Sequence, residues 1–312
     1  MYSSDWIVRS CPSCQGSNYS LKPEVESPTR AESHSFEEVK KYFIGLRKEQ
    51  VFFSYHRCLD CGLLYCPRYF SEAQLEILYS EMPDNLMGED KGTISKTQNG
   101  YVKWATKYLN STNKFVEVGP DIGLVTNCVI NQFHPVEVGL IEPNHTIRQE
   151  LLDNAKQVEL VHIVDTLSQL DMKNVDFVIG VHVYDHLLDP IGDLKKLNSI
   201  SDPEAKLLIV VHNEKSALRK LLKKKWPPFC LQHPQLYNPT TLGNVLEKAG
   251  WKLEVVSKST NWWRVSHFVG LGLGILGLPS KWTRLLPKFE VPIRLGNMIT
   301  LAKRNGTTPI QP

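Results

Sequence analysis

The chain of 312 residues has no run of about 18 apolar residues, the length that a membrane-spanning helix needs. Its first ten residues contain no apolar stretch of the kind found in signal peptides. A strong charge of one sign is also missing, since the formal net charge is +3, and a basic stripe suited to nucleic acid is not seen. These absences predict a cytoplasmic protein without a transmembrane segment or a nucleic-acid partner.

The composition excludes two further classes. Seven cysteines are an odd number, which argues against a disulfide framework in an intracellular chain. With 42% hydrophobic and 22% charged residues the chain is expected to be globular rather than disordered. Its length is sufficient for one large domain and a small one.

Four of the cysteines form two Cys-x-x-Cys pairs, separated by 43 residues. A Cys-x-x-Cys turn presents two thiolates to one ion, and a structural zinc takes four ligands in a tetrahedron. We therefore expect Cys11, Cys14, Cys58 and Cys61 to bind a structural zinc. Unligated thiols are the alternative, and redox chemistry is disfavoured because neither pair opens a thioredoxin-like unit.

From about residue 100 onward, short apolar segments alternate with segments of helical spacing. The expected strands cover residues 114–118, 136–141, 158–164, 175–181, 205–211, 251–257 and 298–303. The expected helices cover residues 101–109, 124–131, 146–154, 193–200 and 240–249. Such alternation predicts an α/β domain with a mostly parallel sheet. The expected organisation is a zinc-binding domain over 1–80, a linker over 81–100 and a catalytic domain over 101–305, with an apolar insertion around 262–295.

The first strand of this domain leads into a turn that suits a small ligand, Glu117-Val118-Gly119-Pro120-Asp121-Ile122-Gly123. Glycines let the backbone turn tightly and approach a ligand, and the free amides of the following helix can hold a carboxylate. A dinucleotide site needs a glycine at the middle position, where this chain has Asp121. Glu117 would repel a pyrophosphate but would suit the positively charged amino group of a methionine moiety.

Two more acids follow the next two strands. Glu142 ends the second strand, where a carboxylate can accept hydrogen bonds from both ribose hydroxyls. Asp165 ends the third strand, where a side chain can reach an adenine amino group. Because ligands of open α/β sheets bind outside the carboxyl ends of the strands, three successive acids there indicate a nucleoside-type cofactor pocket.

Together these features make the segment 101–303 similar to class I S-adenosylmethionine (SAM)-dependent methyltransferases. Residues 117–123 resemble their motif Glu-x-Gly-x-Gly-x-Gly, and Asp185-His186-Leu187-Leu188-Asp189-Pro190 resembles their Glu-His-x-x-Asp-Pro. Residues 232–237 and 242–250 also fit the family pattern. The resemblance implies a Rossmann-like sheet whose last strand is antiparallel. The expected cofactor-binding residues are Glu117, Gly119, Asp121, Gly123, Glu142, Asp165 and His182.

Two residues depart from these motifs. Asp121 replaces the middle glycine, and Asp185 stands where Glu is usual, which keeps the charge. A four-cysteine zinc domain ahead of such a domain resembles the sugar C-methyltransferase group, which acts on nucleotide-linked keto-sugars, although this chain lacks their large extra C-terminal domain.

The expected reaction is methyl transfer from SAM to a small-molecule acceptor, such as a nucleotide-linked sugar. The general base should lie near the carboxyl end of the fourth strand, and histidine suits this role by its intrinsic pKa. His186 beside Asp185 is the favoured pair, His182 is adjacent, and His233 and Tyr237 come second. Simple loop hydrogen bonding is the alternative for these histidines.

Other uses of the chain remain open at this point. One is an RNA or protein methyltransferase that recruits its substrate through the zinc module, and another is a non-catalytic binding module, favoured by Asp121. The apolar stretch at 265–279 predicts a lid or buried connection, or else a membrane-surface or partner contact. The basic run Lys220–Lys225 is either a solvated helix end or a phosphate site. Neither the methylated atom nor the oligomeric state follows from the sequence.

Overall fold

The computed structural model describes residues 3–43, 51–81, 91–266, 269–270, 273, 289–294 and 296–305. Its centre is a seven-stranded sheet in the order β13-β16-β11-β10-β7-β8-β9. The strands are β7 (Lys114–Val118), β8 (Glu137–Ile141), β9 (Leu160–Val164), β10 (Val175–Val181), β11 (Ser201–His212), β13 (Trp251–Lys258) and β16 (Asn297–Arg304).

Numbered along the chain, these strands lie in the order 6-7-5-4-1-2-3, and only β16 runs antiparallel to its neighbours among the described strands. The order reverses at β7, which lies between β10 and β8. Val118 pairs with both Gly180 and Ile141, so the carboxyl ends of these three strands meet at one edge. The expected Rossmann-like sheet, mostly parallel with an antiparallel last strand, is confirmed.

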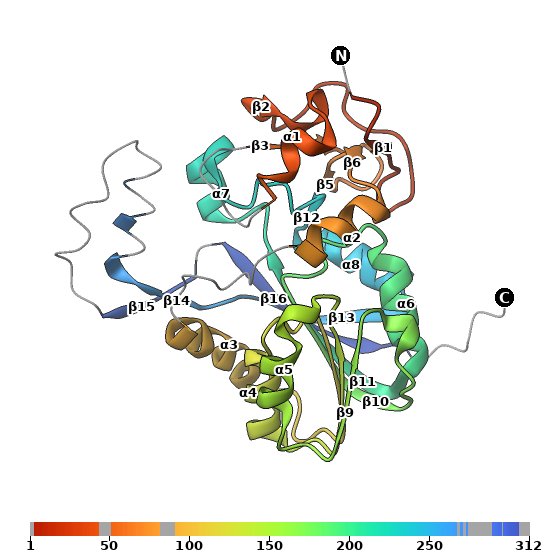
Figure 1. Ribbon diagram of the computed structural model, residues 1–312, viewed down its shortest axis with the longest axis vertical. Helices are drawn as coiled ribbons and strands as arrows, with labels where there is room; N and C mark the ends of the chain where they lie inside the picture. Colours follow the sequence, from red (N-terminus) through yellow and green to blue (C-terminus); the bar gives the residue numbers. More distant parts are fainter. Residues whose placement is uncertain are drawn as a thin grey trace.

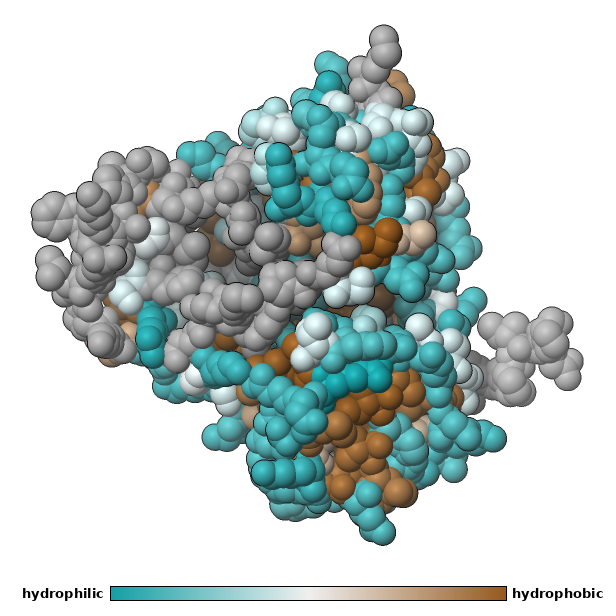
Figure 2. All heavy atoms as spheres, viewed as in Figure 1, coloured by the Kyte–Doolittle hydropathy of each residue, from teal (hydrophilic) through white to brown (hydrophobic). Residues whose placement is uncertain are grey.

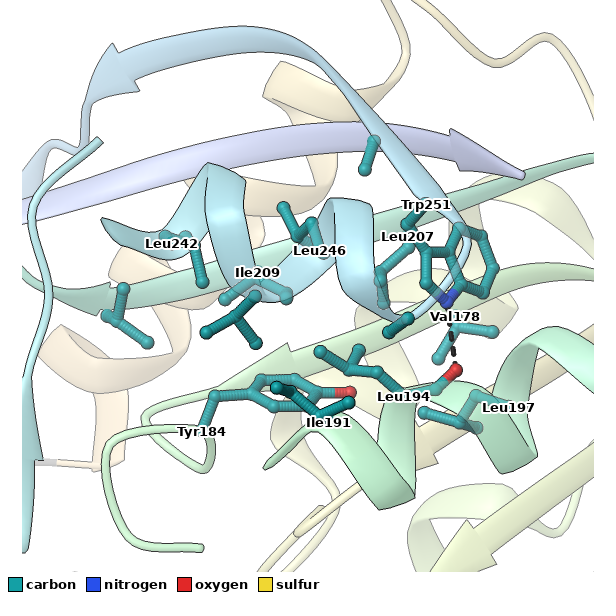
Figure 3. Packing of buried hydrophobic residues seen from close by; sticks show 14 of the residues in the cluster. Val178, Tyr184, Ile191, Leu194, Leu197, Leu207, Ile209, Leu242, Leu246 and Trp251 are labelled. Carbon is teal, nitrogen blue, oxygen red and sulfur yellow. Dashed lines mark hydrogen bonds between the residues drawn. The ribbon is translucent and has the colours of Figure 1, made fainter. Parts of the chain in front are cut away.

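Helices cover both faces of the sheet (Figure 1). One layer consists of α3 (Lys91–Ala105), α4 (Leu124–Phe133) and α5 (Arg148–Ala155), and the other of α6 (Pro190–Ile200) and α8 (Pro239–Lys248). Side chains alternate between the two faces, so that Phe177 and Ile179 pack with the first layer and Val178 with the second. In the second layer the indole of Trp251 donates a hydrogen bond to the Leu194 carbonyl at 2.9 Å (Figure 3).

Several boundaries differ from the sequence expectation. β7 and β10 have the expected bounds, but α3 begins at Lys91 rather than at residue 101. The antiparallel pair β14 (Asn261–Arg264) and β15 (Glu290–Ile293) was not foreseen, since its strands are short and far apart in sequence. Most of the apolar stretch at 265–279 falls outside the described residues. Among those that are described, no helix has the length and apolar character needed to cross a membrane.

The N-terminal segment, residues 3–81 as far as they are described, consists of short elements. They are β1 (Ile7–Val8), β2 (Thr29–Arg30), α1 (Phe36–Lys40), β3 (Val51–Phe52), β4 (His56–Arg57), β5 (Leu64–Tyr65), β6 (Arg68–Tyr69) and α2 (Glu72–Glu81). They lie with α7 (Ala217–Leu222) at the top of the view in Figure 1.

The N-terminal segment shares its core with the connection between β11 and α8, residues 213–238. In this connection β12 (Gln235–Leu236) pairs with β5 and extends the N-terminal sheet. Trp226 and Phe229 pack in one cluster with Trp6 and other aromatic side chains of the N-terminal segment. This packing holds the N-terminal segment against the edge of the central sheet at which the strand ends meet.

Apolar side chains are also exposed. Figure 2 shows them gathered in the lower part of this face, the region in which Figure 1 places α5 and β9. Leu152 of α5 and Leu160 of β9 are 44% and 52% exposed. Leu160 is the first residue of β9, so it lies at the end of this strand opposite to the carboxyl end that carries Asp165.

Candidate functional site

The turn after β7 is held in a tight left-handed conformation. Gly119, Asp121 and Gly123 have φ values of +64°, +52° and +80°. A Cβ on Gly119 would lie 2.6 Å from Cγ2 of Val183, and one on Gly123 would lie 2.7 Å from Cδ1 of Leu151. Asp121 therefore adopts the conformation that favours glycine, which aspartate tolerates better than most residues. Although Asp121 replaces the middle glycine of the motif, the backbone at this position keeps the conformation that a glycine would adopt.

Two of the three expected acids lie at this turn. The carboxylate of Glu142 accepts hydrogen bonds from the backbone N–H of Asp121 at 3.1 Å and of Asn144 at 2.9 Å. The carboxylate of Glu117 accepts one from the Thr126 hydroxyl at 2.5 Å. Burial raises the pKa of both groups, that of Glu117 to about 8. These acids thus sit in a poorly solvated cradle around the glycine turn.

Asp165 lies at the end of β9 and is engaged with two basic side chains. One of its oxygens is bound by the guanidinium of Arg148 and by Nε2 of His145, the latter at 2.8 Å. Asp165 is therefore at the expected strand end, and it also anchors the start of α5.

At the ends of β10 and β11 the structure brings together four histidines and an aspartate, here called the His–Asp cluster: His182, Asp185, His186, His212 and His233. The ring centroids of His182 and His212 are 4.5 Å apart, those of His212 and His233 4.9 Å, and those of His186 and His233 4.7 Å. Sequence reasoning found four of the five and missed His212. The one sequence feature that could have pointed to His212 is its position directly after the expected strand 205–211.

Asp185 lies at the centre of this cluster and is fully buried. Its Oδ2 accepts the backbone N–H of His212 at 3.4 Å. Among the residues that the structure describes, neither Oδ1 of Asp185 nor Nδ1 of His182 has a hydrogen-bond partner, although both atoms are buried. A buried polar atom without a partner costs about 1–3 kcal/mol, so these atoms are expected to serve a ligand.

Burial sets the protonation of the imidazoles. It lowers the pKa of His182, His186 and His212. For His233 burial alone would lower the pKa, but Cys230, the charge of Asp185 and a backbone carbonyl raise it to about 9. The cluster thus combines neutral imidazoles with one that favours its protonated form.

The turn that carries Asp185 and His186 is held from the N-terminal side. Nε2 of Gln235 donates to the carbonyls of Tyr184 at 3.0 Å and Leu187 at 2.6 Å. Arg9 donates to the Leu188 carbonyl at 3.1 Å and to Oε1 of Gln235 at 3.0 Å. The sequence pointed to neither Arg9 nor Gln235 as a positioning residue, because their partners are remote in sequence.

Two tyrosines contact the same turn. The hydroxyl of Tyr79, in α2, lies 3.2 Å from Nδ1 of His186. Tyr237, an expected catalytic residue, donates its hydroxyl to the Tyr184 carbonyl at 3.2 Å and is fully buried. Tyr79, which the sequence analysis missed, is therefore the tyrosine in contact with a cluster imidazole.

The four expected cysteine ligands lie together. Sγ of Cys11 is 3.5 Å from Sγ of Cys61, and Sγ of Cys14 is 3.4 Å from Sγ of Cys58. All four sulfurs lie within 4.8 Å of one another, and none forms a disulfide. A tetrahedral zinc with Zn–S bonds of about 2.3 Å places its sulfurs roughly 3.8 Å apart. The donor set and its spacing therefore fit a zinc ion.

Comparison with protein families matches residues 98–256, just over half of the chain, to the family described as methyltransferase domain. The chain belongs to this family, and the expected enzyme class, a SAM-dependent methyltransferase, is confirmed. The matched segment contains the glycine turn, the strand-end acids and all five residues of the His–Asp cluster. A comparison with curated proteins gave no match.

Among solved structures, the chain is similar to the mitomycin 7-O-methyltransferase MmcR, with 17% identity, a TM-score of 0.48, and 75% of this chain and 58% of that chain covered. It therefore spans less than two thirds of that protein. A putative methyltransferase from Bacillus halodurans C-125 has 12% identity and a TM-score of 0.46, with 68% of this chain and 100% of that chain covered. The N-methyltransferase NodS from Bradyrhizobium japonicum WM9 has 9% identity and a TM-score of 0.47, with coverages of 74% and 97%. Likenesses of this degree do not bear on the acceptor.

Proposed function

We propose that the chain transfers the methyl group of SAM to a small-molecule acceptor, a sugar linked to a nucleotide. One observation carries this proposal: the glycine turn and the His–Asp cluster adjoin. Val183, the residue after His182, is the side chain that a Cβ on Gly119 would meet at 2.6 Å. A cofactor held on the turn would thus present its reactive end to the imidazoles.

In this proposal the acids at the turn hold SAM. Glu142 keeps lone pairs beyond the two backbone hydrogen bonds that it accepts, and these suit the ribose hydroxyls. Burial favours the protonated form of Glu117 in the chain without cofactor, and the methionine ammonium would favour its carboxylate on binding. Asp165 meets the adenine amino group, and His182 borders the sulfonium. The residues present therefore fit the cofactor, which supplies an activated methyl electrophile.

The protein must then align the acceptor, exclude water and take up a proton where the acceptor atom carries one. An imidazole can accept this proton only at a nitrogen with a free lone pair. Nδ1 of His212 donates to Oδ1 of Asn297 at 2.8 Å, which leaves its Nε2 free. His186 has Nδ1 engaged with Tyr79, which directs its other nitrogen into the cluster. We propose His212 and His186 as the candidate bases.

The cysteine cluster is proposed to hold a structural zinc in a domain over residues 1–80, which precedes the catalytic domain. The combination of this segment with a methyltransferase domain supports the assignment to the sugar C-methyltransferase type, whose acceptors are nucleotide-linked keto-sugars. Carbon is then the methylated atom, and the base removes a proton next to the keto group.

The basic run supports an acceptor that carries phosphate. Lys220, in α7, and Lys223, in the short 3₁₀ helix Lys223–Lys225, are exposed in the connection that packs on the N-terminal segment. Lysine ammonium groups bind phosphate as point charges. A Lys220→Ala, Lys223→Ala double variant should raise KM for a nucleotide-linked sugar and leave SAM affinity unchanged.

The proposed function is tested by incubating the full chain with labelled SAM and a panel of nucleotide-linked sugars, each beside its free sugar. We expect label in the nucleotide-linked products only, and a loss of about 10²-fold or more in kcat for His186→Ala or His212→Gln. SAM affinity measured by calorimetry should persist in both variants. Full turnover in both variants and in His233→Ala would overturn the role of the cluster, and label in free sugars alone would overturn the acceptor.

A further inference from the structure

Asp185 is shared by two groups of side chains whose ligating atoms lie within 4.8 Å of one another. One group joins it to His182 and His212, and the other to His186 and His233. Each is a set of two imidazoles and one carboxylate, a combination that binds divalent transition metals. The hydrogen bonds around the imidazoles decide which group can bind an ion.

The first group is excluded by Asn297. Its amide contacts both imidazoles, with Oδ1 2.8 Å from Nδ1 of His212 and Nδ2 3.2 Å from Nε2 of His182. Whichever way the amide is turned, it accepts an N–H from one ring and donates to the other. The ring that accepts from the amide carries its own proton on the opposite nitrogen, where a metal would have to bind. His182 and His212 therefore cannot both be neutral ligands of one ion.

The second group meets the requirement. Nδ1 of His233 lies 2.7 Å from the carbonyl oxygen of Pro228, which can only accept, so Nδ1 carries a proton and Nε2 is the nitrogen left for a ligand. A metal ion that binds at Nε2 displaces the second proton of the imidazolium. Nδ1 of His186 lies 3.2 Å from the Tyr79 hydroxyl, which can accept an N–H and so leave the other nitrogen bare. Partners of this kind on the far nitrogen orient histidines that ligate metals.

The carboxylate completes the set. Oδ1 of Asp185 is buried, has no hydrogen-bond partner among the described residues, and belongs to a fully buried side chain. An ion with bonds of about 2.1 Å holds its ligand atoms roughly 3–4 Å apart. The candidate ligand atoms already lie within 4.8 Å of one another.

We propose that Asp185, His186 and His233 bind one divalent transition-metal ion, separate from the ion of the cysteine cluster. Three protein ligands leave positions open on the ion, as in catalytic rather than structural sites. If the proposed function holds, on which this role rests, the open positions face the acceptor, and the ion polarises its oxygen as a Lewis acid. His212 is then the base, and His186 holds the ion.

The test is the metal content of the full chain, stripped with chelator and titrated with Co²⁺. Cobalt on the cysteines gives thiolate charge-transfer absorption, whereas cobalt on imidazole and carboxylate gives only ligand-field bands. We expect two ions per chain in the wild type and one, with full charge-transfer absorption, in Asp185→Asn and in His233→Gln. His212→Gln, in the same cluster but outside the ligand set, should retain two. Circular dichroism shows whether each variant folds. If one of the two ligand variants does not fold, the metal content of the other tests the proposal.

One ion per chain in the folded wild type would overturn the proposal, as would two ions in both ligand variants. These results are distinguishable from a failure of the proposed function. A chain that holds one ion and still transfers methyl groups refutes the metal site alone. A chain that holds two ions and transfers no methyl group to any acceptor of the panel refutes the proposed function alone.

Discussion

The hydroxyl of Tyr79 lies 3.2 Å from Nδ1 of His186, which joins the last helix of the N-terminal segment to the turn after β10. Arg9 reaches the same turn, and Gln235 holds it through two backbone carbonyls. The N-terminal segment is therefore part of the wall of the site. A cysteine-bearing segment that binds metal would in this way set the position of a candidate catalytic imidazole.

Tyr79→Phe should lower kcat about 5-fold, because one hydrogen bond of roughly 1 kcal/mol that orients His186 is lost. SAM affinity should stay at the wild-type value. Ile77→Ala, on the exposed face of the same helix, is the matched control and should retain full turnover. Steady-state kinetics with the labelled-methyl assay measure both, and wild-type kcat in Tyr79→Phe would refute the orienting role.

Glu117 predicts a distinct dependence of stability on pH. Burial, together with the facing Glu142 and Asp121, raises its pKa to about 8 in the folded chain, from 4.5 for a free side chain. Between these values the folded state keeps a proton that the unfolded state releases, so stability falls as pH rises through this window. Within this window Glu117 lowers the free energy of unfolding by about 1.4 kcal/mol per pH unit.

Glu117→Gln removes this dependence and keeps a partner for Thr126. Relative to the wild type, the free energy of unfolding of Glu117→Gln should therefore increase steadily from pH 5 to pH 8. Urea unfolding without added cofactor measures this difference. A difference that does not change with pH would show that Glu117 is ionised in the folded protein.

The sequence was most informative about features that are defined by consecutive residues, such as short strands and the turns that end them. The apolar run 175–181 and the run 114–118 before Gly119 fixed two strands to the residue, since each is short and ends at a clear turn. Glu142 could be predicted because it directly follows an apolar run, and the end of such a run can be recognised without knowing which strands pair with it. By contrast, His212 joins the cluster through the pairing of β10 with β11, in which Val181 lies opposite Val210.

Other residues were missed because their role arises only from tertiary packing. Asn297 contacts two imidazoles from the last strand of the sheet. Arg9 and Tyr79 reach the site from the N-terminal segment. Its strands are too short to show a hydrophobic pattern in the sequence. The tautomer of each imidazole depends on such remote partners, and no local pattern encodes it.

The cysteine cluster should hold one zinc ion per chain, and its loss should lower Tm. Cys58→Ser removes a ligand and should lower Tm by at least about 10 °C, because a structural zinc contributes many kcal/mol to a small unit. Cys128→Ser, on α4 and outside the cluster, is the control and should change Tm little. Differential scanning calorimetry measures the shift, and an unchanged Tm in Cys58→Ser would contradict the structural role.

Arg57 ties the N-terminal segment to the connection after β11. Its guanidinium contacts the carboxylate of Glu214 at 3.0 and 3.3 Å, and Glu214 is almost fully buried. Glu214→Gln should lower the free energy of unfolding by about 2–3 kcal/mol, because it removes the buried charge that pairs with Arg57. The cost is moderate because the Arg57 side chain is partly exposed to solvent. Glu26→Gln, in an exposed pair with Arg30, should cost less than about 1 kcal/mol. Chemical denaturation compares them, and equal costs would contradict a structural link at Arg57.

The central claim is that the turn after β7 and the acid at the end of β8 bind SAM. Calorimetric titration of the full chain with SAM tests it most directly, with Glu142→Gln beside the wild type and Glu137→Gln, at the opposite end of the same strand, as the control. We predict one SAM per chain for the wild type and the control, and affinity weaker by about 10- to 100-fold in Glu142→Gln, which loses charge-assisted hydrogen bonds to the ribose. No binding to the wild type, or wild-type affinity in Glu142→Gln, would contradict the account.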